Sequence, residues 1–197
     1  MRKVFFSFAW EDIWQVNQVR NSWVTKGSYQ NAGFLDKAEI EKLKLQTNKA
    51  IKAWIDKQIH GTSVTCVLIG ENTSNSEWVK YEIEQSRKLK KGIVVIYIHN
   101  TKNSNGDVGK VGENPLSIYK RTLAEKSEKA ILSGGLVGIL AKSFPLTAPF
   151  AWGLSGLFAV CQLLKNEESY KVYDWIEEDG RNSLGDWIEE AAQQAGR

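Results

Sequence analysis

The sequence predicts an α/β fold in which helices wrap a parallel sheet. Two apolar runs, 62–69 and 93–98, have the composition of strands buried on both faces, as parallel strands covered by helices are. The apolar stretch 3–8 is expected to be a third strand. The segments between these runs show helical apolar spacing, and strands that alternate with helices indicate a doubly wound parallel sheet.

Strand 3–8 is followed by a predicted helix over 12–24. Its apolar stripe recurs every three or four residues, which is the spacing of a helix packed on one face. Asp12 is expected to be its N-cap. Residues 25–35 are predicted to form a polar loop that contains glycine. The stripe consists of Ile13, Val16, Val19 and Trp23.

A long helix is predicted from Asp36 to the C-cap Gly61. Asp36 is suited to cap it, because Glu39 stands three residues on as its partner in a capping box. One face of this helix is mainly apolar. That face comprises Ile40, Leu43, Thr47, Ile51, Trp54, Ile55 and Ile59.

The segment 62–83 carries the most information about function. After strand 62–69 and a short loop, Ser74 is expected to cap a helix over 75–90, with Glu77 as its capping-box partner. Trp78 and Glu82 are four residues apart and share a helix face. This face lies near the C-terminal edge of the sheet, where open α/β folds bind ligands.

The C-terminal third follows strand 93–98 and a long polar loop, 100–115, of a kind that is often functional. A short phrase then occurs twice, at 174–178 and 186–190. We expect its second copy to lie on a terminal helix that starts at Asn182 or Ser183.

The segment 130–164 is almost wholly apolar, with Lys142 as its one charge. We expect two helices that meet near Pro145, an apolar helical hairpin inserted at about 123–166 into a single domain, 1–197. Two interpretations remain open, a buried or oligomer-forming hairpin and contact with a membrane. The second piece, 146–164, is borderline in length for a spanning helix.

Composition excludes several classes of function. The formal net charge of +3 and the dispersed Lys and Arg side chains do not indicate nucleic-acid binding. With only two histidines and two separated cysteines, the sequence has no zinc-binding spacing, and we predict no metal site. The absence of a signal peptide and of a disulfide framework indicates the cytoplasm, with membrane association as the alternative.

Several phrases resemble TIR (Toll/interleukin-1 receptor) domains, whose fold is flavodoxin-like. These are the strand 4–8 with Glu11 and Asp12, and the pattern that joins Ser76, Trp78 and Glu82. The sequence is similar above all to the short prokaryotic TIR-like family that includes the TIR subunit of Thoeris anti-phage systems. Its phrases match at 19–26, 62–70, 78–83, 114–115 and 173–180. The resemblance covers residues 3–118 and 170–197 and leaves out 130–164.

The resemblance implies an enzyme that cleaves the nicotinamide–ribose bond of NAD, an NAD nucleosidase or ADP-ribosyl cyclase. It assigns the catalytic carboxylate to Glu82, although spacing alone fits an ordinary exposed helix carboxylate. We expect NAD to be the substrate, with no separate cofactor. The residues expected to contact it are Phe6, Ser7, Phe8, Asp12, Trp78 and Asn114. Trp78 fits a core position equally well.

Three functions follow as hypotheses. The first is an enzyme that makes an ADP-ribose-derived signal for a separate effector in anti-phage defence. The second is a membrane-active effector that uses 130–164. The third is a non-catalytic TIR-like interaction module. Self-association is expected, with membrane contact through 130–164 as the alternative.

Overall fold

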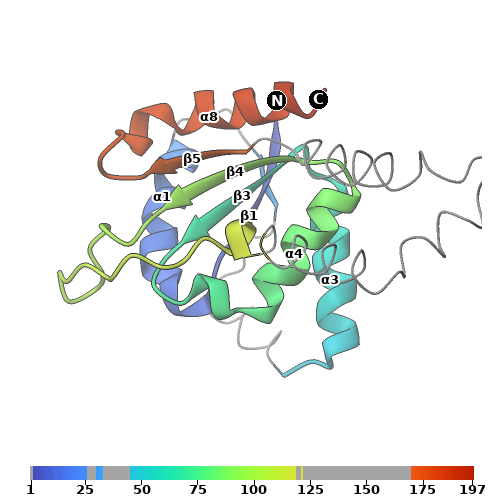
Figure 1. Ribbon diagram of the computed structural model, residues 1–197, viewed down its shortest axis with the longest axis horizontal. Coiled ribbons are helices and arrows are strands. Elements are labelled where there is room, and N and C mark those ends of the chain that lie inside the picture. Colours follow the sequence, from blue (N-terminus) through green and yellow to red (C-terminus); the bar gives the residue numbers. More distant parts are fainter. Residues whose placement is uncertain (1, 26–29, 33–44, 119–120, 122–169) are drawn as a thin grey trace, which may run out of the picture. The chain divides into compact units, whose positions relative to one another are not determined.

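The computed structural model describes residues 2–25, 30–32, 45–118, 121 and 170–197 (Figure 1). The chain divides into two compact units, one of residues 1–115 with 169–197 and one of residues 116–168. The fold below is that of the first unit. The predicted insertion at 123–166 and its apolar hairpin lie outside the described residues. Among the helices described, none is long and apolar enough to cross a bilayer.

A parallel sheet forms the centre of the first unit, with the strand order β2-β1-β3-β4-β5 (Figure 1). The three strands predicted from apolar runs are adjacent and parallel, so the predicted fold class is confirmed. The strands are β1 Lys3–Ser7, β2 Gln30–Ala32, β3 Val64–Ile69, β4 Gly92–Tyr97 and β5 Lys171–Asp174.

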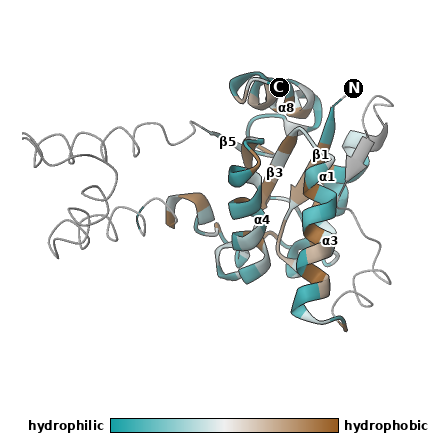
Figure 2. Cartoon of the chain, turned by 90° about the vertical axis from the view of Figure 1, so that its right-hand side faces the viewer, coloured by the Kyte–Doolittle hydropathy of each residue, from teal (hydrophilic) through white to brown (hydrophobic). Residues whose placement is uncertain are grey.

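Helices cover the two faces of this sheet (Figures 1 and 2). Helices α1 (Ile13–Thr25) and α8 (Gly180–Gln194) contact each other over one face, and α3 (Asn48–His60) and α4 (Glu77–Lys88) contact each other over the other face. The described helical turns η1 (Trp10–Asp12) and η2 (Thr73–Asn75) follow the ends of β1 and β3.

Helix α3 begins later than the sequence predicted. Residues 45–47 are not helical, and the Thr47 hydroxyl caps the helix by accepting a hydrogen bond from the Ala50 N–H at 3.3 Å. The predicted cap at Asp36 lies outside the described residues, but a helix that runs unbroken from there is wrong. Thr47 was the one polar residue on the predicted apolar face, and its role as the N-cap of α3 explains why a threonine stands there.

The start of α4 also differs from the prediction. Ser76 caps the helix by accepting a hydrogen bond from the Val79 N–H at 3.3 Å, whereas Ser74 lies inside η2. The Thr73 hydroxyl accepts a hydrogen bond from the Gly70 N–H at 2.9 Å, which folds this stretch into its own turn and delays the helix by two residues. Helix α8 begins at Gly180, before the predicted Asn182 or Ser183.

Among the described residues, two apolar clusters lie between the sheet and its helices. Phe6 and Trp23 pack edge to face within the larger cluster, under α1 and α8. Phe5 packs with Ile55 and its neighbours in the smaller cluster, under α3 and α4. Successive residues of β1 therefore point to opposite faces of the sheet, as strand geometry requires.

Candidate functional site

The end of β1 meets helix α4 at a hydrogen-bonded pair of buried side chains. The Ser7 hydroxyl donates to Glu82 Oε2 at 2.6 Å, and the two residues are 75 positions apart in the sequence. Ser7 has none of its surface exposed and Glu82 has 9%. Glu82 is therefore a buried carboxyl and not the exposed helix carboxylate that spacing alone suggested.

Strand alternation explains why Ser7 reaches α4. Ser7 is two residues beyond Phe5, which packs under α3 and α4, so both side chains point to this face. Glu82 reaches the strand because α4 packs on β1 and β3 through its buried face, which includes Val79 and Ile83. The fold thus carries a carboxyl to the C-terminal edge of the sheet.

One oxygen of this carboxyl is held and the other is not. Oε2 accepts the Ser7 hydrogen bond, whereas Oε1 of Glu82 has no hydrogen-bond partner among the residues that the structure describes. Oε1 is therefore the oxygen left to contact a bound molecule, and it accepts a hydrogen bond once the carboxyl is ionised.

Burial changes the acidity of Glu82. Removal from water raises its pKa to about 8, and the hydrogen bond from Ser7 acts against this rise because it favours the charged form. At neutral pH the carboxyl of the free protein is therefore mainly protonated. A cation bound beside it would favour the ionised form and lower the pKa.

Asp12 lies at the same edge of the sheet, in contact with the turn after β3. Its Oδ2 accepts a hydrogen bond from the Thr73 hydroxyl at 3.2 Å. Burial raises its pKa to about 6, opposed by the Thr73 hydrogen bond and aided by the nearby charges of Glu11 and Glu71. The backbone of Gly70 passes so close that a Cβ there would collide with the Asp12 carboxyl.

The aromatic residues predicted to contact NAD pack against the apolar clusters, and their contact with NAD stays a prediction. Phe6 is buried in the cluster under α1 and α8, and Phe8 packs against that cluster and edge to face on Trp10. Trp78 is partly buried against the cluster under α3. The structure thus brings Ser7 and Glu82 together and gives the aromatic residues packing roles.

Asn114 is buried near the end of the long loop after β4. This loop passes very close to the turn after β3. A Cβ at Gly112 would collide with the carbonyl oxygen of Gly70. The loop therefore approaches the same sheet edge as Asp12, and a site role for Asn114 stays a prediction.

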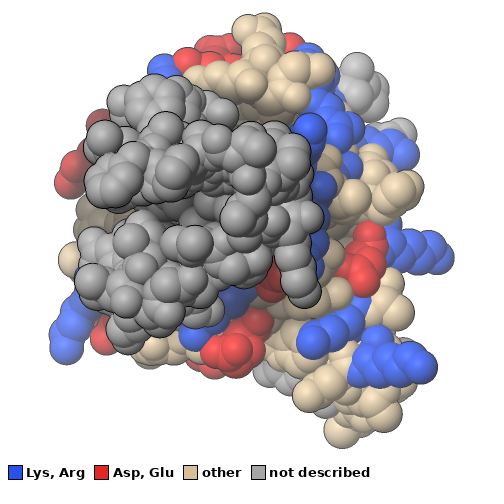
Figure 3. Space-filling view, turned by 45° about the vertical axis from the view of Figure 1, so that its right-hand side comes forward, with Lys and Arg blue, Asp and Glu red and all other residues tan. Residues whose placement is uncertain are grey.

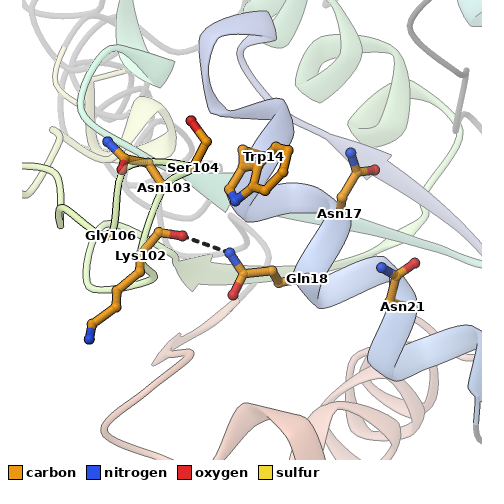
Figure 4. A pocket seen from close by; sticks show the side chains of 8 residues that line it. All are labelled: Trp14, Asn17, Gln18, Asn21, Lys102, Asn103, Ser104 and Gly106. Atoms are coloured by element: carbon orange, nitrogen blue, oxygen red, sulfur yellow. Dashed lines mark hydrogen bonds between the residues drawn. The ribbon is translucent and has the colours of Figure 1, made fainter.

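A groove of about 600 Å³ lies between α1 and this loop (Figure 4). Gln18 Nε2 bridges its walls by donating to the Lys102 carbonyl at 2.7 Å. Trp14 has 53% of its surface exposed in the groove, and sequence reasoning missed it. The sequence did offer one sign of this surface, because Trp14 is an aromatic residue outside the apolar stripe of α1. The other lining residues are Asn17, Asn21, Asn103, Ser104 and Gly106.

In the part of the chain that the structure describes, no group of three or more His, Cys, Asp or Glu side chains is placed so that it could hold a metal ion. The face shown in Figure 3 carries Lys and Arg side chains beside Asp and Glu side chains. Its charge is therefore of mixed sign.

Comparison with known proteins shows what the chain is similar to. Residues 5–103 match the family described as Thoeris protein ThsB, TIR-like domain. The chain is 33% identical over 203 residues to a Bacillus cereus (strain MSX-D12) protein named "Putative cyclic ADP-D-ribose synthase ThsB1", covering 95% of this chain and 98% of the relative. The TIR domains of the activated Roq1 resistosome are 17% identical at a TM-score of 0.41, covering 98% of this chain and 96% of theirs.

The alignment with the Bacillus relative corrects one sequence-based inference. Coverage of 95% of the chain leaves out too few residues to omit the segment 130–164, so the similarity extends through most of that segment. The family match includes both Ser7 and Glu82. This chain belongs to the Thoeris ThsB family of TIR-like domains.

Proposed function

We propose that this protein cleaves the nicotinamide–ribose bond of NAD and makes an ADP-ribose-derived signal in anti-phage defence. The observation that carries the proposal is the Glu82 carboxyl at the C-terminal sheet edge, with Oε2 held by Ser7 and Oε1 without a hydrogen-bond partner among the described residues. The name of the Bacillus relative, "Putative cyclic ADP-D-ribose synthase ThsB1", supports the same class of product.

The reaction creates a charge that a carboxylate can stabilise. The bond from ribose C1′ to the nicotinamide nitrogen breaks, and its electron pair leaves with the nitrogen, so the cationic ring departs as neutral nicotinamide. The positive charge passes to the ribose as an oxocarbenium ion, the same problem that glycosidases solve with carboxylates. The Glu82 carboxylate would stabilise this cation and accept a hydrogen bond from a ribose hydroxyl.

The oxocarbenium ion is then captured by a nucleophile. Attack by water gives ADP-ribose and releases a proton, whereas attack by a nitrogen of the adenine in the same molecule gives a cyclic product. The site must be closed to water for the second outcome. We propose that the product acts on a separate effector protein.

Burial of Glu82 is compatible with this role. The nicotinamide ring of NAD is a cation, and its binding near Glu82 would favour the ionised carboxyl by opposite charge. The substrate would thus help to create the charged form that the reaction needs, from a group whose pKa in the free protein is about 8.

The test is nicotinamide release from NAD by the purified 197-residue chain, with and without lysate of phage-infected cells. Glu82→Gln keeps the shape and removes the charge, and we expect a loss of about 100-fold or more in rate. Glu84→Gln is the matched control, because Glu84 lies on the same helix, half-exposed, and pairs with Lys88 at 2.7 Å.

Near wild-type nicotinamide release by a folded Glu82→Gln protein would remove Glu82 from the mechanism. No release by the wild-type chain under either condition would favour the non-catalytic interaction module. Separation of the reaction mixture distinguishes linear from cyclic ADP-ribose in the same experiment.

A further inference from the structure

A buried chain of hydroxyl groups lies beneath Glu82. The Ser86 hydroxyl donates to the backbone carbonyl of Glu82 at 2.7 Å, one helical turn earlier. Thr65 Oγ1 lies 2.7 Å from Ser86 Oγ. A hydroxyl has only one proton, and that of Ser86 goes to the carbonyl, so Thr65 is the donor to Ser86. This chain connects strand β3 to the backbone of Glu82.

Ser7 completes the arrangement from the neighbouring strand. The register of β1 and β3 pairs Phe5 with Thr65 and Ser7 with Val67, which places Ser7 and Thr65 on the same face of the sheet, under α4. Ser7 donates to the side chain of Glu82, while Thr65 acts through Ser86 on its backbone. Glu82 is thus held at two points from two strands.

These hydroxyls are unusual choices for their positions. Ser7, Thr65 and Ser86 have none of their surface exposed, and Ser7 and Thr65 lie in strands that, apart from the exposed Lys3, are otherwise apolar. Burial of a hydroxyl costs free energy unless it is hydrogen-bonded, and an apolar side chain of similar size would avoid that cost. A serine that bonds back to the carbonyl four residues earlier slightly destabilises a helix. Stability alone therefore does not account for the three hydroxyls.

We propose that Ser7, Thr65 and Ser86, here called the hydroxyl frame, are positioning residues that fix the carboxyl of Glu82 with Oε1 open toward the substrate. Ser7 sets the rotation of the carboxyl, and the chain from Thr65 through Ser86 sets the position of α4 over β3. The proposal rests on the proposed function only for the chemistry that Glu82 performs.

The first test measures the effect of the hydroxyl frame on the titration of Glu82 and does not depend on catalysis. Carbon-13 NMR of the Glu82 carboxyl, assigned by its loss in Glu82→Gln, follows its titration in the wild type and in Ser7→Ala. The Ser7 hydrogen bond lowers the Glu82 pKa from the value that burial alone would give. We therefore expect the titration midpoint to move to higher pH in Ser7→Ala. An unchanged midpoint in a folded variant would overturn the part assigned to Ser7, whether or not the protein cleaves NAD.

The second test measures kcat and KM for NAD in variants of Thr65 and Ser86, whose hydroxyls are hydrogen-bonded to each other. We expect Thr65→Val and Ser86→Ala each to lower kcat about tenfold with a smaller change in KM, because misplacement of a catalytic group slows the chemical step. Both residues act through one chain, so the double variant should lose little more than either single variant. Thr65→Ser and Ser86→Thr keep the hydroxyls and should recover most of kcat.

Thr101→Val is the matched control for Thr65→Val. The Thr101 side chain is also buried, with 2% of its surface exposed, but its hydroxyl has no hydrogen-bond partner among the described residues. The same chemical change there should leave kcat and the Glu82 titration unchanged. If Thr65→Val and Ser86→Ala fold and keep wild-type kcat while Glu82→Gln is inactive, the frame is wrong and the proposed function stands. If Glu82→Gln is fully active, the proposed function fails, and the Ser7→Ala titration still tests the frame.

Discussion

At the scale of single residues, the burial of Glu82 decides how the protein responds to pH. The sequence suggested a carboxylate on a helix surface, for which Glu→Gln changes stability by about 0.5 kcal/mol or less. The structure places it in a buried site that raises its pKa to about 8. The folded state therefore holds the Glu82 proton to higher pH than the unfolded chain, in which the carboxyl titrates near 4.5.

The sign of the resulting pH effect follows from linkage. Since the folded protein binds the Glu82 proton more tightly than the unfolded chain, stability from this residue is fully present below about pH 4.5 and is lost as pH rises to about 8. Gln has no such titration. We expect Glu82→Gln to raise the melting temperature more at pH 9 than at pH 5, measured by circular dichroism. An equal shift at both pH values would contradict a buried, titrating Glu82.

The sequence located part of this site for reasons that the structure makes clear. Glu82 was found by family resemblance, and its partner Ser7 lay in the predicted phrase of residues 6–8. The period of two in a strand separates Ser7 from Phe6 and Phe8, and only Ser7 faces α4. Trp78 was assigned to the ligand because it shares a helix face with Glu82. It also packs, partly exposed, against the α3 cluster, a tertiary contact that spacing does not reveal, and its contact with NAD stays a prediction.

At the scale of elements, the buried strands were predictable and the edge strands were not. β3 and β4 are buried along almost their whole length, so their sequences are continuous apolar runs. β2 is three residues long with the sequence Gln-Asn-Ala, and β5 is mostly exposed or half-buried. Short edge strands carry polar residues and resemble loops. The two copies of the repeated phrase, at 174–178 and 186–190, also adopt different structures. The first copy begins at the last residue of β5 and continues into a turn, whereas the second lies in α8.

The contact between the turns after β1 and β3 provides a test at this scale. A Cβ at Gly70 would collide with the Asp12 carboxyl, so Gly70→Ala forces one turn to move. We expect a loss of about 1–3 kcal/mol in the free energy of unfolding, as for other overpacked sites. Asp12→Ala removes the colliding group, and the double variant should be more stable than the sum of the single changes predicts. Urea denaturation of the four proteins measures this, and simple additivity would contradict the contact.

At the scale of the whole molecule, the apolar segment 130–164 remains the feature with the largest predicted consequence. It contains a single charged residue, Lys142, and pairs of small residues at Gly134 with Gly138 and Ser155 with Ala159. Such spacing permits close contact between helices. The alignment with the Bacillus relative covers 95% of the chain and so runs across this segment.

We propose that this segment prevents the chain from existing as a simple monomer, because a soluble monomer rarely exposes an apolar patch larger than a few hundred Å². The measurement is size-exclusion chromatography with light scattering of the whole chain without detergent, followed by flotation with phosphatidylglycerol vesicles. We expect either a mass that is a multiple of 22.2 kDa or recovery with the vesicles.

Gly134→Leu with Gly138→Leu should reduce self-association by blocking close helix contact, whereas Gly106→Ala, in a polar loop, should leave the mass unchanged. A monodisperse species of 22.2 kDa that does not float would show that the segment is buried within its own chain, and both the oligomer and the membrane interpretations would then be wrong.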